Sequence, residues 1–225
     1  MADDDLEPNV FGRTRRDGPE MSLATYNIVI GLVLSWGFFI NWLIVRYIDA
    51  SSLLVGLNYI LFIAGYIASC LYGVHLFNTS KDPSMSFIGY NFVVIPFGLV
   101  LSIVLGHYQP GLVLQAVQVT AGVTVLMMIV GTVRPEWFQT VPGSLTIALV
   151  AAILVELIHG AVFHHVPEWI EWVVAIGFCS YIGYDWGRAL RIPRTVDNAV
   201  DSAAAIYMDV LNLFLRVLRI LGRRR

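Results

Sequence analysis

Charged residues are scarce in this sequence, and their scarcity excludes most soluble folds. Of the 225 residues, 13% are Asp, Glu, Lys or Arg, whereas 57% are hydrophobic. A water-soluble domain of this length needs more charge than that to cover its surface. The composition therefore predicts a protein whose partner is the lipid bilayer. The net charge of only -2 argues against nucleic acid as a partner.

Cysteine and lysine are almost absent. Cys70 and Cys179 both lie inside apolar runs, where two small buried hydrophobic side chains are expected rather than a disulfide. The single lysine, Lys81, lies in a polar stretch. A retinal protein is excluded, because it needs a Schiff-base lysine in its last span. The phosphate-binding pattern GxxxxGK[ST] is also missing.

The N-terminus lacks the features of a signal peptide. Residues 1–21 are acidic, contain proline and glycine, and hold few large apolar side chains. A segment of that composition cannot bury enough apolar surface to fold, so we expect a disordered tail. Residues 22–222 are expected to form one transmembrane domain, followed by a basic tail over residues 223–225.

Long apolar runs fill the rest of the chain. A helix needs roughly 20 apolar residues to cross a hydrocarbon core of ~30 Å. Backbone groups in lipid must also be paired within their own segment, so the runs should be helices. The sequence thus predicts an all-α membrane protein with seven spans, at about residues 23–45, 53–76, 87–105, 112–133, 141–163, 170–190 and 203–221. A polar loop is expected between the last two spans, over about residues 191–202.

The seventh run is short and polar. It contains Asp209, Asn212, Arg216 and Arg219 at near-helical spacing. Such a segment could lie in the membrane interface as an amphipathic helix. It could instead cross the membrane with its polar side turned towards other helices or water. Spacing alone leaves both interpretations open.

The distribution of basic residues predicts the orientation of the chain. With seven spans, the N-terminal side holds eight of them: Arg13, Arg15, Arg16, Lys81, Arg134, Arg188, Arg191 and Arg194. The opposite side holds six: Arg46, Arg216, Arg219, Arg223, Arg224 and Arg225. This count favours a cytoplasmic N-terminus, although the C-terminal arginines oppose it.

Two aspartates lie at matching depths in the last two spans. A carboxylate at membrane depth usually pairs, protonates or serves an ion path. Asp185 and Asp209 each lie roughly 8–10 Å from the expected loop, at 1.5 Å per residue, so they are level in an antiparallel helix pair. Two close carboxylates cannot easily both ionise and would titrate as a unit. The spacing predicts a pH sensor, a cation site or both; alternatively, each aspartate faces water separately.

A second polar group lies on the fifth run. Glu156 and His159 are three residues apart, so they share a helix face. They could relay protons or bind a cation, or they could form a polar patch that seals a helix contact. His164 and His165 follow beside Glu168, but adjacent histidines point in different directions and the sequence places no third ligand. We therefore predict no cofactor, and no metal apart from a cation at the aspartate pair.

The last two runs carry a specific resemblance. The stretch AIYMDVLNLFLRVLRILG, from Ala205 to Gly222, resembles the terminal signature of the Bax inhibitor-1 family, approximately LYLDxxNLFxxLLRxxG. The stretch SYIGYDWGRA, from Ser180 to Ala189, resembles the family pattern LYxxYDxxxI. Looser agreement covers nearly all the chain after Met21, including Tyr90, Asn91, Thr120, Gly131 and Arg134.

The resemblance implies a fold and a function. The fold would be a seven-helix bundle with the C-terminal helix at its centre, surrounded by the other six. The function would be that of a pH-sensitive calcium leak channel, not an enzyme, with protons and calcium or other cations as its partners. Asp185 and Asp209 would be the pH sensor, and Asn212 and Arg216 would lie on the polar face of the central helix. The compact chain favours a prokaryotic plasma membrane.

One family feature is missing. Bacterial members place an arginine near the end of the second helix, where it latches to the aspartates. Here the nearest ionisable residue in that helix is His75, with Lys81 further along. If His75 takes the role, the latch itself would titrate near pH 6.5.

Two other functions are compatible with the sequence. The chain could be a non-conducting adaptor that regulates other membrane proteins or stress pathways, with its acidic and basic tails as docking sites. It could also be an intramembrane hydrolase resembling haemolysin III, with a metal on His159, His164 and His165.

Overall fold

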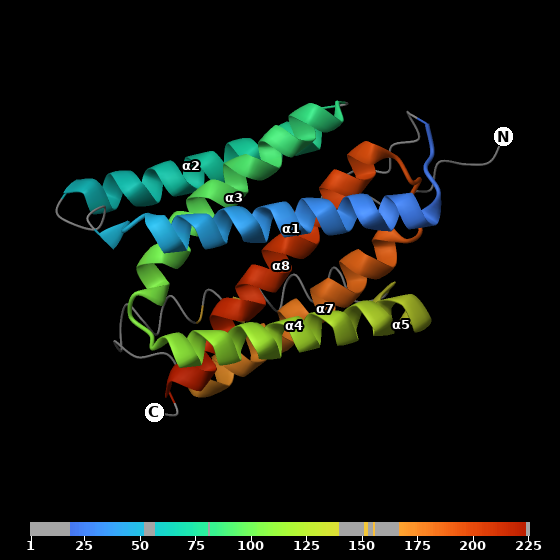
Figure 1. Ribbon diagram of the computed structural model, residues 1–225. Coiled ribbons are helices and arrows are strands. Elements are labelled where there is room, and N and C mark those ends of the chain that lie inside the picture. Colours follow the sequence, from blue (N-terminus) through green and yellow to red (C-terminus); the bar gives the residue numbers. More distant parts are fainter. Residues whose placement is uncertain are drawn as a thin grey trace. The chain divides into compact units, whose positions relative to one another are not determined.

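The structure is a computed structural model, which describes residues 19–51, 57–80, 82–139, 151–152, 155 and 167–223. Within those ranges the regular structure is entirely helical, so the predicted all-α fold class is confirmed (Figure 1). The helices are α1 (Leu23–Tyr47), α2 (Leu57–Thr79), α3 (Pro83–Leu105), α4 (Pro110–Val133), the single turn α5 (Glu136–Gln139), α7 (Glu168–Ala189) and α8 (Val196–Arg223).

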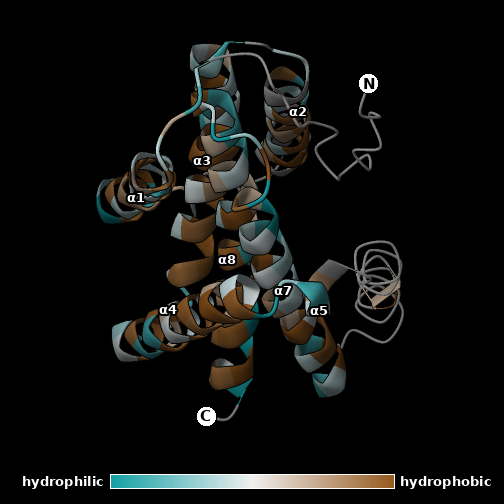
Figure 2. Ribbon diagram, turned by 90° about the vertical axis from the view of Figure 1, so that its right-hand side faces the viewer, coloured by the Kyte–Doolittle hydropathy of each residue, from teal (hydrophilic) through white to brown (hydrophobic). Residues whose placement is uncertain are grey.

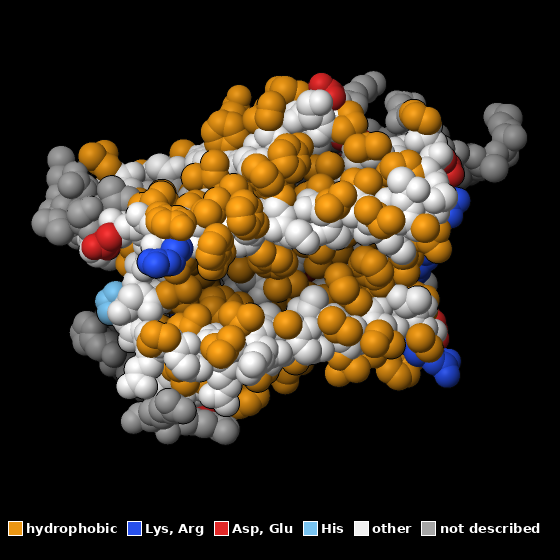
Figure 3. Space-filling model, in the orientation of Figure 1, with side chains coloured by type: hydrophobic (Ala, Val, Ile, Leu, Met, Phe, Trp, Pro, Cys, Tyr) orange, Lys and Arg blue, Asp and Glu red, His pale blue; other side chains and the backbone are white. Residues whose placement is uncertain are grey.

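Three helices of the described chain are long and apolar enough to cross a membrane. They are α1, α3 and α4, whose most apolar windows have mean hydropathies of 2.3, 2.2 and 2.0. In α2 the apolar stretch is shorter, Ile60–Leu76. Apolar residues line these helices (Figure 2), and hydrophobic side chains cover most of the face shown in Figure 3. A surface of this kind suits lipid, as expected for an integral membrane protein.

Local signals explain where the first helices begin. Asp82 caps α3, because its Oδ1 accepts a hydrogen bond of 3.0 Å from the Ser84 amide, and Pro83 occupies the first turn. Proline there loses no helical hydrogen bond. As a result α3 begins four residues before the predicted span. Ser22 caps α1 in the same way, with 3.1 Å between its Oγ and the Thr25 amide.

The chain divides into two compact units. The first comprises residues up to His107 and residues 192–204. In it α1 and α2 both pack on α3. The α2–α3 contact is close at Gly73, where a Cβ atom would lie 2.5 Å from the carbonyl oxygen of Gly89. Only glycine allows the two backbones to approach so nearly.

The second unit comprises residues 108–191 and 205–225. In it α4 and α5 pack on α7. A Cβ atom at Gly131 of α4 would lie 2.5 Å from the carbonyl oxygen of Gly183 in α7. The Phe138 ring of α5 covers the other side of Gly183, at 2.5 Å from where its Cβ would be. Small residues therefore set the spacing of α4, α5 and α7.

The start of α8 differs from the sequence prediction. A loop was expected over about residues 191–202, but the helix begins at Val196. Thr195 Oγ1 accepts a hydrogen bond of 3.2 Å from the Asn198 amide, as an N-terminal cap does. Polar residues of the first turns are bound in the first unit: Ser86 Oγ donates to Asp197 Oδ1 at 2.7 Å, and the Tyr26 hydroxyl lies 3.3 Å from Ser202 Oγ. Their polarity reflects buried partners, not solvent.

Burial along α8 is nearly complete. Every residue from Asp197 to Gly222 is buried or half-buried, although this helix is among the most polar. A helix lying on the membrane surface would leave one side exposed.

Several sequence predictions fall outside the described residues. They concern residues 1–18 of the N-terminal tail, Lys81, most of the fifth span at 141–163, and Arg224 and Arg225.

Candidate functional site

The second unit brings together the two aspartates that the sequence singles out. Asp185 lies near the end of α7 and Asp209 in the middle of α8, with exposed fractions of 7% and 9%. Their carboxyl groups are close enough to interact directly. Two carboxylates in contact repel each other unless a proton or a cation lies between them.

The packing of α7 explains the direction of Asp185. Gly183 and Gly187 are four residues apart and share a face, and both approach Gly131 of α4 closely. Asp185 lies between them in the sequence, so it projects from the other side of the helix. The Trp186 indole donates to Thr132 Oγ1 at 2.8 Å and fixes the rotation of α7 against α4. Asp185 is thereby held towards α8.

One carboxyl oxygen of the pair lacks a hydrogen-bond partner among the described residues. Asp209 Oδ2 is buried and has no hydrogen-bond donor among the described residues. A buried oxygen without a donor is costly unless a proton, a cation or water meets it. The pair can therefore accept a further positively charged or donating species.

A basic residue next to the pair was not predicted as part of the site. Arg188 is half-buried and interacts electrostatically with Asp185, three residues before it on the same helix face. From the sequence, Arg188 was counted only among the charges that set the orientation of the chain. The spacing of three residues was the signal that could have identified it.

The other residues of the predicted polar face have partners of their own. Asn212 donates from Nδ2 to the Met208 carbonyl oxygen at 2.8 Å, within α8. Arg216 donates to Glu171 Oε2 at 2.9 Å. Neither contact involves the aspartate pair.

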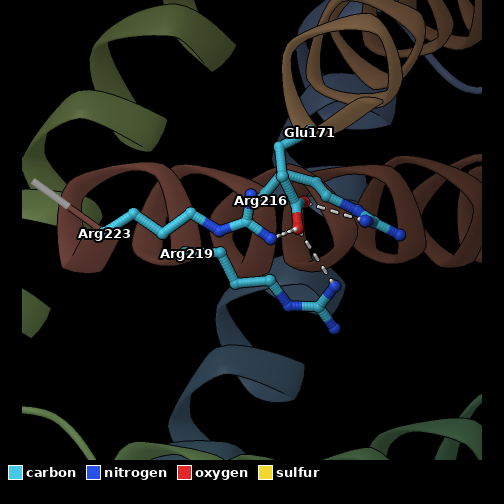
Figure 4. A network of polar contacts seen from close by, with 4 residues as sticks. All are labelled: Glu171, Arg216, Arg219 and Arg223. Atoms are coloured by element: carbon cyan, nitrogen blue, oxygen red, sulfur yellow. Dashed lines mark hydrogen bonds and ion pairs between the residues drawn. The ribbon is translucent and has the colours of Figure 1, made fainter. Parts of the chain in front are cut away.

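Glu171 forms the most extensive ionic contact in the described part of the chain. Its side chain is 1% exposed and meets three arginines of α8 (Figure 4). The shortest distances from its carboxylate are 2.9 Å to Arg216, 3.6 Å to Arg219 and 3.4 Å to Arg223. We refer to these four residues as the Glu171 cluster.

Glu171 was not predicted as a site residue. It is the second residue of the predicted sixth span, where a charged side chain is ordinary. It precedes Asp185 by 14 positions, and Arg223 follows Asp209 by 14. Because these two spacings are equal, an antiparallel pair of helices that brings the aspartates together also places Glu171 level with the last turns of α8.

Other predicted site residues remain apart from the pair or undescribed. His75 is exposed on α2, in the first unit, whereas the aspartates belong to the second. Its latch role stays a prediction. Glu156, His159, His164 and His165 lie outside the described residues. Within the described ranges, no group of three or more His, Cys, Asp or Glu side chains could hold a metal ion.

Comparison with known proteins points to one family. The family described as "Inhibitor of apoptosis-promoting Bax1" matches residues 20–225. Bax inhibitor 1 of Schizosaccharomyces pombe is 32% identical over 132 residues, which is 56% of this chain and 47% of that protein. The inner membrane protein YbhL of Escherichia coli K12 is 28% identical over 141 residues, 57% of this chain and 59% of YbhL. The match thus spans about half the length of these curated relatives.

Proposed function

Because the chain belongs to the family of inhibitors of apoptosis-promoting Bax1, we propose that it is a membrane leak pathway for calcium, gated by protonation of Asp185 and Asp209. The observation that carries the proposal is the direct interaction of two buried carboxyl groups, one on α7 and one on α8. Carboxylate oxygens are also the ligands that calcium prefers.

The mechanism follows from the charge of the pair. With one shared proton, the two carboxyl groups hold each other and carry a single negative charge. When the proton leaves, two negative charges repel at short range, and a divalent cation can replace the proton between them. Protonation then weakens cation binding, so the leak decreases as the pH falls.

Arg188 would bias this equilibrium. Its guanidinium acts on Asp185 from one turn along α7 and favours the ionised form of that carboxyl.

The membrane and orientation are part of the proposal. The relative from Escherichia coli is an inner membrane protein by name. We propose a plasma membrane location with a cytoplasmic N-terminus, as the basic residues favour.

Calcium flux into liposomes containing the purified chain tests the gating. We expect wild-type flux to change with pH, and Asp185→Asn and Asp209→Asn to abolish that change, because neither variant retains two titrating carboxyls. The matched control is Asp49→Asn, an exposed aspartate after α1, which should keep the wild-type pH response. Unchanged responses in both pair variants would overturn the gating. A wild-type chain without calcium flux would favour the non-conducting adaptor.

A further inference from the structure

Two threonines of α4 lack the hydrogen bond that hydroxyl side chains of helices commonly form. Such a hydroxyl donates to the carbonyl oxygen four residues before it, as Thr79, Thr132 and Ser180 do at 2.8, 2.8 and 3.0 Å. In contrast, the Oγ1 atoms of Thr120 and Thr124 are buried and have no hydrogen-bond partner in the described part of the chain. Thr120 is only 3% exposed. A buried hydroxyl without a partner is unfavourable, and valine would fill the same space without that penalty.

Both threonines lie on the buried side of α4. The buried residues of this helix are Leu112, Ala116, Thr120 and Gly131. Thr124 continues the spacing of four residues that runs from Leu112 to Thr120, so it shares their face. One end of this face packs on α8, where a Cβ atom at Gly222 would lie 3.6 Å from Leu112 Cδ2, and the other end packs on α7 at Gly131. The two hydroxyls therefore lie inside the second unit and not on its lipid-facing surface.

A third buried oxygen without a partner among the described residues is Oδ2 of Asp209. Asp209 interacts with Asp185, which lies in α7 beside the glycine contact with the end of α4. Gly222, 13 residues further along α8, packs at the start of α4. The two helices are therefore antiparallel, and at 1.5 Å per residue Asp209 lies within roughly two turns of Thr124 in depth. Thr120 lies one turn further from the pair, so the three oxygens follow one another along the inside of the unit.

We propose that Thr120 and Thr124 line the cation path that leads from the aspartate pair towards the end of α8, and that their hydroxyls bind water and the partly hydrated cation. This inference rests on the proposed function and extends it from the pair to the path. A neutral oxygen replaces part of the hydration shell of a cation but holds it less tightly than a carboxylate does, and conduction requires that the cation leaves. In the packed arrangement seen here, the three oxygens have no partner among the described residues. Hydration would supply one to each, so the hydroxyls favour opening of the path.

Calcium flux into liposomes at alkaline pH tests the lining. Valine has the shape of threonine without its hydroxyl, so Thr120→Val with Thr124→Val should lower the flux about tenfold, whereas Thr120→Ser with Thr124→Ser should retain it. The control is Thr79→Val, which removes a hydroxyl bonded within α2 and should conduct like the wild type. Wild-type flux in the double valine variant would overturn the proposal, and so would an equal loss in the serine variant.

The stability of the double valine variant separates lining from a structural role. Because this variant loses only hydroxyls without a partner, it should unfold in detergent at the wild-type temperature or above. A lower unfolding temperature would mean that the two hydroxyls support the fold, and it would overturn the proposal.

Reaction of introduced cysteines with a charged thiol reagent shows whether water reaches this side of α4, whether or not calcium passes. In a background with Cys70 and Cys179 replaced by Ser, Thr124→Cys should react at alkaline pH with a methanethiosulfonate that carries a quaternary ammonium group. The matched control is Val125→Cys, at the same depth but on the outer side, where Val125 is 57% exposed and lipid excludes the reagent. No reaction at Thr124→Cys, or equal rates at both positions, would overturn the proposal. Reaction of Thr124→Cys in a chain that passes no calcium would support the lining and overturn only the calcium assignment of the proposed function.

Discussion

Glu171 is the side chain whose loss should be most costly to stability. It is almost fully buried, and Arg216 opposite it is also largely buried. Glu171→Ala would remove the buried carboxylate that lies 2.9 Å from the Arg216 guanidinium. Removing one partner of a buried ion pair costs about 3–5 kcal/mol. Thermal or denaturant unfolding in detergent should show a loss of this order.

The control for this substitution is another ion pair of the same unit. Arg134 and Glu136 lie 3.5 Å apart with exposed fractions of 60% and 53%. Exposed pairs contribute little, so Glu136→Ala should unfold close to the wild type. If Glu171→Ala lowered the free energy of unfolding as little as Glu136→Ala does, the Glu171 cluster would contribute little to stability.

Single residues were partly predictable from the sequence. Asp185 and Asp209 could be singled out because a carboxylate in an apolar run is conspicuous. The equal distance of both from the loop was wrong, because α7 ends at Ala189 and α8 already begins at Val196, so that Asp209 lies much further from the loop than Asp185 does. Glu171 was missed because it lies at the edge of its run, where charge is ordinary. Its partners are known only once the last turns of α8 are placed beside it.

Among the helices, the contact between α4 and α7 depends on glycine. A Cβ atom at Gly131 would meet the Gly183 carbonyl oxygen at 2.5 Å, and a backbone atom cannot rotate away as a side chain can. Gly131→Ala should therefore force α4 and α7 apart and lower the free energy of unfolding by about 1–3 kcal/mol. Because α7 carries Asp185, the same variant should also alter the pH response of the calcium flux.

Gly122 of the same helix provides the control. A Cβ atom there would meet nothing within 4 Å, so Gly122→Ala should leave stability unchanged or slightly higher. Unfolding of both variants in one detergent is the comparison. Equal stability of Gly131→Ala and Gly122→Ala would contradict the close packing.

Helix existence was easier to predict than helix ends. The apolar runs matched α1, α3 and α4 because a long unbroken hydrophobic run seldom forms anything but a membrane-spanning helix. The first turns of α8 were assigned to a loop because Asp197, Asn198, Asp201 and Ser202 look solvated in the sequence. They are buried by residues far away in the chain, such as Ser86 and Tyr26. No local pattern could have revealed those partners.

At the scale of the whole molecule, the orientation in the membrane is a testable prediction. With seven spans and a cytoplasmic N-terminus, the ends of α1 and α4 lie on opposite sides. In a background with Cys70 and Cys179 replaced by Ser, Asp49→Cys should react with an impermeant thiol reagent from outside the cell. Glu136→Cys should react only after the membrane is opened. Reaction of both from the same side would contradict the predicted number of spans between them.

Hydropathy describes the outside of this molecule better than its inside. The helices α1, α3 and α4 are recognisable from their apolar sequences, whereas α7 and α8 are long enough to cross a membrane but less apolar. The central place of α8 was implied by the resemblance of Ala205–Gly222 to a family signature. The residues from Asp197 to Gly222 are buried or half-buried, and the central place of the helix stays a prediction.

The polarity of α8 has a consequence for biogenesis. Each Asp or Arg near the centre of an isolated span opposes translocon insertion by about 2.5–3.5 kcal/mol, and α8 carries Asp209 near its middle, with Arg216 two turns further along. The helices before it in the chain emerge from the ribosome earlier and can be inserted into the bilayer before α8 is synthesised. We expect α8 fused alone behind a glycosylation reporter to fail to insert, and to insert when the preceding residues 1–195 are present. Maturation of the protein would then end with a late step in which its most polar helix packs against helices that are already inserted in the membrane.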